Sequence, residues 1–238
     1  MTVGGLCRSL RVAQMTRIKI CGITNVEDAE AAVALGADAL GFVFAESPRW
    51  IEPQAAGAIV RALPPFVAAV AVVVDEPIED LRQMLEASGC GAVQLHGKEP
   101  PDYLEQLDPW RTIKLSRWRV IKAFRVREVG DLRRLSRYKR ADAFLLDSHV
   151  PGKAGGTGIA FDWGVAREAA AFCKADAADK PIILAGGLNP DNVTAALEAA
   201  RPYAVDVSTG VEAAPGRKDF KLMRDFVRAV REFDASQG

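Results

Sequence analysis

The amino-acid sequence predicts a single-domain α/β protein, a (β/α)8 barrel of the TIM type, on three observations. The chain has 238 residues, close to the ~250 typical of one such barrel. From residue 17 onward, short β-rich runs alternate with amphipathic runs rich in Ala, Leu, Glu and Arg, which is typical of parallel βαβ units. Eight such units fit in the chain, and that number favours a closed barrel over an open sheet.

The predicted strands are apolar almost throughout, as expected when both faces of a parallel sheet are covered. They are Arg17–Cys21, Ala39–Phe44, Val67–Val74, Gly91–Leu95, Val120–Phe124, Ala143–Asp147, Ile182–Ala185 and Ala204–Ser208.

The predicted helices fill the segments between and after these strands. They are Val26–Leu35, Pro53–Leu63, Ile78–Ala87, Pro101–Leu107, Val129–Tyr138, Trp163–Lys174, Asn192–Ala200 and Phe220–Phe233. Asn25 is expected to cap the first helix, with Asp28 at its third position. Gly36 is expected to end that helix. Asn189 followed by Pro190 predicts a cap and first helical position for a later one.

Two segments lie outside this regular pattern. Residues 1–14 carry Arg8 and Arg11 but no acidic residue, and we expect a flexible N-terminal extension ahead of a catalytic barrel domain spanning residues 15–238. A transit peptide is a competing interpretation. Residues Trp110–Trp118 are expected to form a local insertion between the fourth helix and the fifth strand.

The charge balance argues against partners that bind through charge alone. Lys and Arg total 31, as do Asp and Glu, so we expect neither nucleic acid nor an anionic membrane as a partner. The stretch Arg111–Arg140 carries twelve basic residues and two acidic ones. A polyanion-binding surface is therefore a competing hypothesis, although most charge runs are solvated faces.

The cysteines and histidines bear on the compartment and on metal binding. The four cysteines are Cys7, Cys21, Cys90 and Cys173. Their wide spacing, without a C-x-x-C motif, favours reduced thiols and a cytoplasmic setting. His96 and His149 are the two histidines, and they form no metal-ligand pattern. We expect no metal and no organic cofactor.

The first strand ends in a candidate catalytic residue, Cys21. In such a barrel the active site lies at the C-terminal ends of the strands. Strand alternation puts Cys21 on the face of Arg17 and Lys19, with Ile18 and Ile20 facing the helices. A nearby ammonium would favour the thiolate, which can act as a base or nucleophile. A buried, inert cysteine fits the position equally well.

The sixth strand ends in the second candidate, Asp147. It shares a face with Ala143 and Leu145, and a carboxyl group at the barrel mouth is suited to general acid or base catalysis. A cap for the following loop is the alternative. That loop, residues 148–160, is rich in glycine and is expected to act as a mobile lid.

The loops after the seventh and eighth strands predict a phosphate site. Barrels often bind phosphate there through backbone N–H groups. Gly186, Gly187 and Gly210 would let the backbone approach phosphate oxygens, while Ser208 and Thr209 add hydroxyl donors. Ordinary tight turns are the alternative.

Three further side chains are candidates for substrate contacts at the mouth. Arg49 follows Pro48 and is suited to bidentate recognition of a carboxylate, although it could be an ordinary surface arginine. Gln94 and His96 share one face of the fourth strand and its end, and both can reach the mouth. A lone histidine is more often structural.

Seven blocks of sequence, in unbroken order from about Arg17 to the C-terminus, resemble the phosphoribosylanthranilate isomerase family. The blocks are Lys19–Thr24, Gly36–Asp38 followed by Gly41–Phe44, Ser47–Arg49, Gln94–Gly97, Gly155–Gly158 with Phe161–Trp163, Leu184–Pro190 and Asp206–Glu212. In register, they are far more specific than any single motif.

The resemblance implies a function and a set of residue roles. The family converts N-(5-phosphoribosyl)anthranilate to 1-(2-carboxyphenylamino)-1-deoxyribulose 5-phosphate, an Amadori rearrangement in tryptophan biosynthesis. Such an enzyme is an intramolecular oxidoreductase, an aldose–ketose isomerase without a cofactor. Asp147 would be the general acid that opens the ribose ring, and Cys21 the base that removes the C2 proton. Arg49 would hold the anthranilate carboxylate.

The phosphate would be held by the two glycine-bearing loops. The residues implied are Gly186, Gly187, Ser208, Thr209 and Gly210. We count Asp206, Gln94 and His96 among the substrate-binding candidates as well. The expected partner is thus a small phosphorylated substrate. We expect a monomer, with a homodimer as the alternative.

Two other functions remain open at this point. A ProFAR-type phosphosugar isomerase of histidine biosynthesis would be expected to use two aspartates, and a cysteine at the first strand end counts against it. A non-catalytic phosphate-binding barrel is the second alternative. The chain departs from the family where Ser208-Thr209 stands, since the family often has two serines there.

Overall fold

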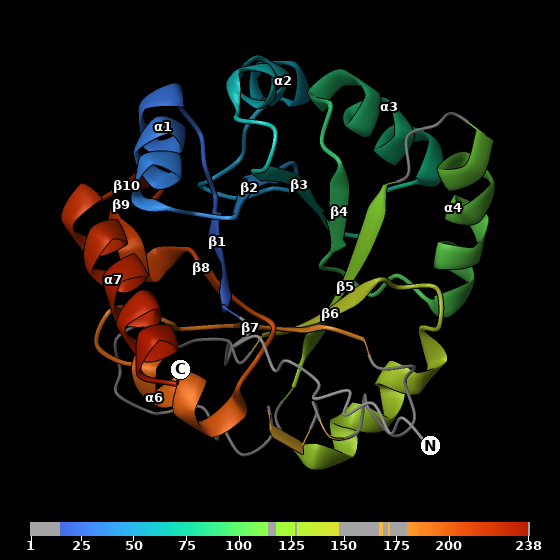
Figure 1. Ribbon diagram of the computed structural model, residues 1–238. Helices are drawn as coiled ribbons and strands as arrows, with labels where there is room; N and C mark the ends of the chain where they lie inside the picture. Colours follow the sequence, from blue (N-terminus) through green and yellow to red (C-terminus); the bar gives the residue numbers. More distant parts are fainter. Residues whose placement is uncertain are drawn as a thin grey trace, which may run out of the picture.

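The strands of this protein close into a ring, with helices packed around the outside (Figure 1). The structure is a computed structural model that describes residues 15–113, 118–126, 128–147, 167–168, 171 and 180–237. The predicted N-terminal extension, residues 1–14, lies outside the described residues, as does the expected lid, residues 148–160.

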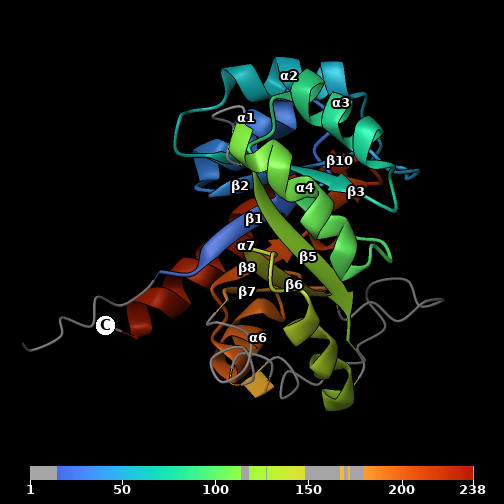
Figure 2. The same ribbon diagram turned by 90° about the vertical axis from the view of Figure 1, so that its right-hand side faces the viewer.

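Eight parallel strands form the barrel. They are β1 (Arg17–Cys21), β2 (Ala39–Val43), β3 (Ala68–Val73), β4 (Ala92–Leu95), β5 (Arg119–Arg125), β6 (Ala143–Asp147), β7 (Ile182–Ala185) and β8 (Ala204–Val207). Each strand pairs with the next, and β8 pairs with β1 to close the ring, with Lys19 opposite Asp206. The side view shows strands such as β5 running at a slant (Figure 2), as barrel closure requires. The predicted fold class is confirmed.

Helices follow most of the strands. The α-helices are α1 (Val26–Leu35), α2 (Pro53–Ala62), α3 (Ile78–Ser88), α4 (Pro101–Ile113), α6 (Val193–Ala200) and α7 (Phe220–Ser236). Within the described ranges, two segments are 3₁₀ helices, η1 (Val129–Arg137) and η2 (Thr209–Val211). A small antiparallel hairpin, β9 (Glu212–Ala214) with β10 (Arg217–Lys218), precedes α7. The helix expected over Trp163–Lys174 lies mostly outside the described residues.

The predicted helix ends are confirmed for α1 and wrong for α6. The Asn25 side chain accepts a hydrogen bond from the Asp28 amide at 2.8 Å, and Gly36 ends α1 with a φ of 99°. However, α6 begins only at Val193. The Asn189 side chain instead accepts from the amides of Asp191 and Asn192, because it closes a turn ahead of the helix.

The local insertion predicted at Trp110–Trp118 is wrong in its first part. Helix α4 continues to Ile113, although Pro109 lies within it and a proline commonly ends a helix. Residues 114–117 lie outside the described residues, and β5 begins at Arg119.

The core confirms the predicted alternation of side chains along the strands. Ile18, Ile20, Phe144 and Leu146 belong to the large apolar cluster between the strands and the helices. A second cluster fills the barrel interior, and its members are Val70, Ala92, Ile121, Ala123, Ala143, Leu145, Ile183, Ala185 and Ala204. Residues that face inward near the strand ends therefore point toward the mouth.

Four basic residues in the described part of the stretch Arg111–Arg140 pair with carboxylates. Lys122 is buried and its Nζ lies 2.8 Å from Glu99 Oε2. Three exposed arginines pair with carboxylates: Arg119 with Asp142, Arg134 with Asp131 and Arg140 with Asp108. These pairs weaken the polyanion-binding hypothesis.

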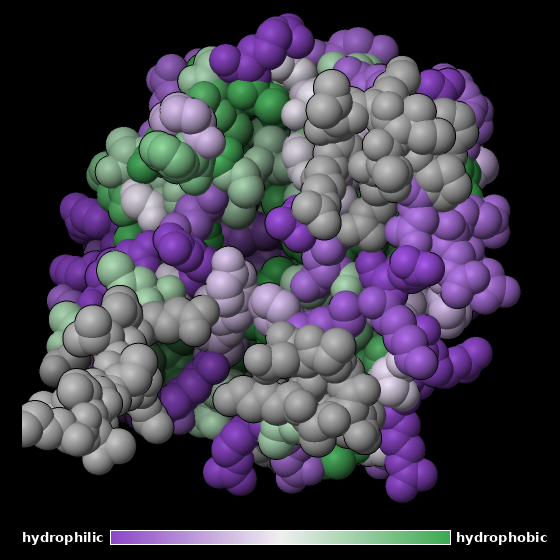
Figure 3. All heavy atoms as spheres, turned by 45° about the vertical axis from the view of Figure 1, so that its right-hand side comes forward, coloured by the Kyte–Doolittle hydropathy of each residue, from purple (hydrophilic) through white to green (hydrophobic). Residues whose placement is uncertain are grey.

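The surface is mixed in character. Figure 3 shows hydrophilic residues along much of the outline of one side and a hydrophobic area at its upper left. Among the described residues, no helix is both long enough and apolar enough to cross a membrane.

Candidate active site

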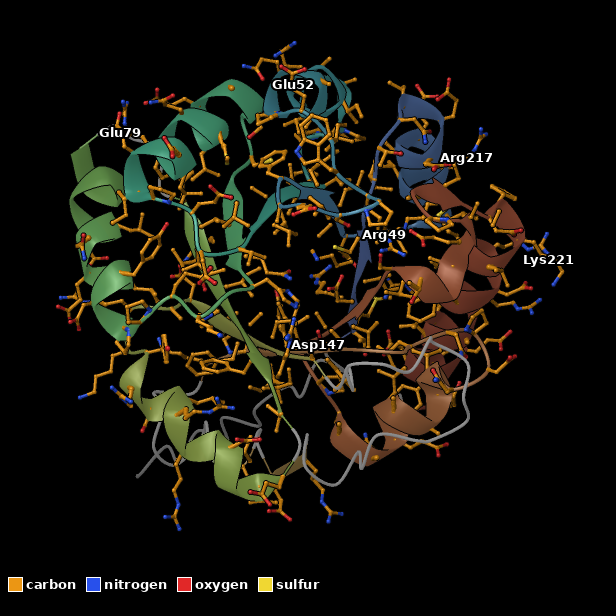
Figure 4. The ribbon with its side chains drawn as sticks, turned by 180° about the vertical axis from the view of Figure 1, so that it is seen from behind. Arg49, Glu52, Glu79, Asp147, Arg217 and Lys221 are labelled. Atoms are coloured by element: carbon orange, nitrogen blue, oxygen red, sulfur yellow. The ribbon has the colours of Figure 1, made fainter. Side chains whose placement is uncertain are left out.

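The candidate residues gather at the C-terminal ends of the barrel strands. Cys21 ends β1 and Asp147 ends β6. Figure 4 shows Arg49 and Asp147 inside the ring of helices, whereas Glu79 and Lys221 lie on its outer edge. The structure thus brings residues distant in sequence to one mouth.

Cys21 fits into a space left by a glycine on the neighbouring strand. Gly41 on β2 stands opposite Cys21 in the register. A Cβ atom added at Gly41 would lie 2.7 Å from Cys21 Sγ and 3.1 Å from Lys19 Cε. A side chain at this position would therefore displace the thiol of Cys21 and crowd the end of the Lys19 side chain.

Lys19 lies buried below the mouth and connects three strands. Its Nζ donates to Asp206 Oδ1 at 2.9 Å and to Gln94 Oε1 at 3.0 Å. Its Cε lies against Gly41, beside the thiol of Cys21. Asp206, a predicted substrate-binding residue, is buried and holds Lys19 in place.

Burial controls the protonation of Cys21. Desolvation raises the pKa of this thiol above its ordinary value, and Asp206 adds to that effect, while Lys19 and Lys218 lower it. The expectation that Lys19 favours the thiolate is right in sign. It is incomplete, because burial outweighs the nearby ammonium groups.

Cys90 provides a contrast to Cys21. It is the other free cysteine in the described part of the chain, and it lies buried beyond the end of α3. Burial raises its pKa to about 11, and no cation is among the groups that oppose this shift. A buried thiol without a cationic neighbour stays protonated and reacts poorly, so Cys21 has the more reactive setting.

Asp147 is in contact with His96. Asp147 Oδ2 lies 3.2 Å from His96 Nε2, and His96 Nδ1 lies 2.7 Å from Gln94 Nε2. The predicted residues Gln94 and His96 are therefore at the mouth, but they contact protein groups on both sides of the barrel.

Arg49 is held by a carboxylate that the sequence reasoning did not single out. Its Nε and Nη2 donate to the two oxygens of Glu212 at 2.8 and 2.7 Å. Lys218 Nζ, whose side chain is fully buried, lies 2.9 Å from Glu212 Oε1. Burial would raise the pKa of Glu212, but hydrogen bonds from Arg49 and Lys218 bring it below its ordinary value. The three groups together carry one net positive charge.

Glu212 and Lys218 differ in how far the sequence could have revealed them. Glu212 ends the last block of the family resemblance, so its position was visible although its role was not. Lys218 lies in β10, and nothing in its local sequence indicates that the hairpin folds it toward Glu212.

The absence of a side chain at Gly22 leaves the space that the Arg49 side chain occupies. Gly22 adopts a φ of +81°, and a Cβ atom there would lie 2.6 Å from Arg49 Cδ and 3.2 Å from Ser208 Oγ. Arg49 and Ser208 therefore both lie against the end of β1. This places the loop after β8 beside the predicted carboxylate-binding arginine.

The loops after β7 and β8 pack directly on each other. Gly186 and Gly187 adopt φ values of 89° and 67°. A Cβ atom at Gly210 would lie 1.9 Å from the Leu188 carbonyl oxygen. This close approach requires glycine, and it joins the two loops that were predicted to bind phosphate.

Gly210→Ala should destabilise this junction. The added methyl group meets backbone, which cannot move as a flexible side chain can, and overpacking costs ~1–3 kcal/mol. We expect Tm to fall by ~2–4 °C for each kcal/mol lost, measured by calorimetry. Gly91→Ala is the matched control, since nothing lies within 4 Å of a Cβ atom there. Equal Tm values for the two variants would contradict the packing described.

No group of three or more His, Cys, Asp or Glu side chains among the described residues could hold a metal ion. The mouth contains Cys21 and Asp147 as candidates for acid–base chemistry and Arg49 as an arginine that binds a carboxylate. It also contains two glycine-bearing loops that pack on each other. Together with the closed barrel, they define the class of this protein: a TIM-barrel enzyme that acts on a small phosphorylated metabolite.

Comparison with known proteins gives the family. A family model described as N-(5'phosphoribosyl)anthranilate (PRA) isomerase matches residues 18–229. The N-(5'-phosphoribosyl)anthranilate isomerases of Pelobacter propionicus and Trichlorobacter lovleyi are 47% and 49% identical to this chain. Each match covers 92% of the chain and 97% or 99% of the relative. The chain belongs to the N-(5'-phosphoribosyl)anthranilate isomerase family.

Solved structures agree with this assignment. The phosphoribosyl anthranilate isomerase of Thermotoga maritima has a TM-score of 0.81 and 41% identity, covering 92% of this chain and all of its own. A second crystal structure, at a TM-score of 0.76 and 39% identity, holds reduced 1-(o-carboxyphenylamino)-1-deoxyribulose 5-phosphate and covers 92% of this chain and 100% of its own. The reaction of this enzyme is the isomerisation of phosphoribosylanthranilate in tryptophan biosynthesis.

Proposed function

We propose that Asp147 and Cys21 divide the two proton transfers of this isomerisation between them. Asp147 donates a proton to the ribose ring oxygen, the C1–O bond breaks, and the nitrogen lone pair forms a protonated Schiff base. The Cys21 thiolate then removes the C2 proton. The C2–H electron pair forms a C1–C2 double bond, and the resulting enolamine tautomerises to the aminoketose. Each transfer by a positioned side chain is worth ~10²–10⁴-fold.

The separate positions of the two residues support this division. They end strands on different sides of the ring, β1 and β6, and both face inward. Lys19 and Lys218 lower the pKa of Cys21, so they stabilise the thiolate that the second step requires. His96 contacts Asp147 and orients its carboxyl group.

Arg49 binds the anthranilate carboxylate in this proposal. Glu212 holds the guanidinium group, and Lys218 in turn holds Glu212. The net positive charge of the three groups is balanced when a substrate carboxylate arrives. Gly186, Gly187, Ser208, Thr209 and Gly210 cradle the phosphate, supported by the direct packing of the two loops.

Arg49→Met should remove the preference for a carboxylate on the substrate. We expect the wild type to favour phosphoribosylanthranilate over its carboxylate-free aniline analogue by ~10–100-fold in kcat/KM, since hydrogen bonds to charged groups are worth ~1.5–3 kcal/mol. In Arg49→Met the two substrates should become nearly equal. The measurement is a paired steady-state assay.

The matched control for this prediction is Arg217→Met. Arg217 is an exposed residue of the hairpin that also carries Glu212, and it lies on the outer edge of the molecule (Figure 4), so its loss should keep the full discrimination. Unchanged discrimination in Arg49→Met would contradict the role given to Arg49.

We further propose a cytoplasmic monomer with no nucleic-acid or membrane partner. The zero net charge and the free thiols of Cys21 and Cys90 support this setting. One related Thermotoga maritima structure is described as a monomer generated from a dimeric enzyme. Sedimentation of this chain distinguishes the states, and a concentration-independent dimer would refute the monomer.

The proposed chemistry is tested with freshly prepared phosphoribosylanthranilate. The observation that carries the proposal is the placement of Cys21 and Asp147 at inward-facing strand ends above Lys19 and beside His96. We expect rapid turnover of this substrate without added metal and none of the ProFAR substrate. Turnover of ProFAR alone would contradict the proposal.

A further inference from the structure

A continuous chain of hydrogen bonds crosses the barrel from β8 to β6. Asp206 accepts from Lys19, and Lys19 donates to Gln94 at 3.0 Å. Gln94 contacts His96 Nδ1 at 2.7 Å, and His96 Nε2 contacts Asp147 Oδ2 at 3.2 Å. The chain therefore runs from a buried ion pair below the mouth to the proposed general acid.

The chemistry of Lys19 sets the direction of every bond in this chain. An ammonium group has three donors and no acceptor, and Lys19 directs two of these donors to Asp206 and Gln94. Gln94 must therefore present its carbonyl oxygen to Lys19. The opposite amide orientation would place its NH₂ group against the ammonium.

The orientation of Gln94 in turn determines the tautomer of His96. With its oxygen on Lys19, Gln94 presents its NH₂ group to His96 Nδ1. Nδ1 must then accept, so the ring carries its proton on Nε2. That N–H is directed at Asp147 Oδ2.

We propose that Gln94 is a positioning residue that locks neutral His96 in the Nε2–H tautomer, so that His96 donates to Asp147 and orients it. The proposal rests on the proposed role of Asp147 as the acid. It assigns Gln94 and His96 to the control of that acid, where the sequence had suggested substrate contacts for both.

The surroundings of the chain support a fixed arrangement. Gln94 and Lys19 are 1% and 3% exposed, so water does not compete for their bonds. Both ends of the Gln94 amide are engaged by protein groups. The His96 backbone is anchored by its amide, which donates to the Val73 carbonyl at 2.9 Å.

The test reads the tautomer directly by ¹⁵N NMR on the full chain labelled at histidine. The sequence has two histidines, so His96→Asn assigns the signals by loss of one set. In the wild type we expect His96 to be protonated on Nε2 and unprotonated on Nδ1. Gln94→Glu offers only acceptors, so it should move the proton to Nδ1.

The activity of the same Gln94 variants is measured alongside the NMR spectra. Gln94→Glu should lower kcat at least ~10-fold, the size expected when a hydrogen bond to a charged group is lost. Gln94→Leu removes the hydrogen bond from the Gln94 amide to His96 Nδ1 without adding charge. It should leave His96 exchanging between its two tautomers, with a similar loss of kcat. It serves in place of Gln94→Glu if the buried carboxylate prevents folding.

Two results would overturn the proposal. In the first, His96 of the wild type is protonated on Nδ1. In the second, the His96 proton stays on Nε2 in the Gln94 variants. These outcomes are independent of catalysis. Failure of the acid role would show instead as near-normal kcat in Asp147→Asn with the tautomer intact.

Discussion

Asp147→Asn should lower kcat by at least ~10²-fold, the contribution of a positioned proton donor, with a much smaller change in KM. Asparagine keeps the shape of the side chain, and its carbonyl oxygen can still accept from His96 Nε2, which lies 3.2 Å from the Asp147 carboxylate. The variant therefore removes the transferable proton and leaves the hydrogen bond in place. Steady-state kinetics with fresh substrate measures the effect.

A binding control separates this loss from a disturbed fold. Reduced 1-(o-carboxyphenylamino)-1-deoxyribulose 5-phosphate, the ligand of a related crystal structure, is the probe. Asp147→Asn should bind it with nearly wild-type affinity, since the carboxylate and phosphate contacts are intact. A near-normal kcat would refute the acid role of Asp147.

Cys21→Ser should also lower kcat by at least ~10²-fold, because a hydroxyl group is a far weaker acid than a thiol and supplies almost no anionic base near neutral pH. Burial holds the pKa of Cys21 above its ordinary value, so the thiolate fraction grows as pH rises through the alkaline range. Wild-type kcat/KM should therefore increase with pH on this limb. Cys21→Ser should lose that increase.

Cys90→Ser is the matched control for this substitution. Cys90 is equally a buried free thiol, yet it lies away from the mouth, after α3. We expect its activity and pH profile to match the wild type. If Cys21→Ser keeps the wild-type rate, the C2 proton is removed by another group.

The barrel itself could be predicted from local signals, because each βα unit has its own apolar strand run and its own amphipathic helix run. Strand ends fall within one residue of the predicted bounds, from Arg17–Cys21 to Ala204–Val207. The alternation along β1 and β6 depends only on the period of a strand, and it correctly placed Cys21 and Asp147 on the inner face.

The contacts between distant segments could not be predicted in the same way. The pairing of Arg49 with Glu212 spans 163 residues, and Lys218 reaches the same carboxylate from a hairpin that has no counterpart in the repeated pattern. The raised pKa of Cys21 likewise depends on burial by the whole mouth. Such features arise from tertiary packing, so a sequence pattern does not carry them.

Two glycines show the same limit on predicting tertiary contacts from sequence. Gly210 was predicted to help bind phosphate, yet its Cα approaches the Leu188 carbonyl so closely that packing alone requires glycine. Gly41 was only part of a family block, and it makes the space that Cys21 and Lys19 occupy. Residues beside a site can thus be as constrained as those in it.

The division of labour between Asp147 and Cys21 is the central claim, and a deuterium isotope effect tests it most directly. Phosphoribosylanthranilate deuterated at C2 is compared with the ordinary substrate in each variant. In Cys21→Ser, removal of the C2 proton limits the rate, so the full primary isotope effect on kcat should appear. In Asp147→Asn, ring opening limits the rate, so the effect should vanish. Equal isotope effects in the two variants, or the reverse pattern, would contradict the account.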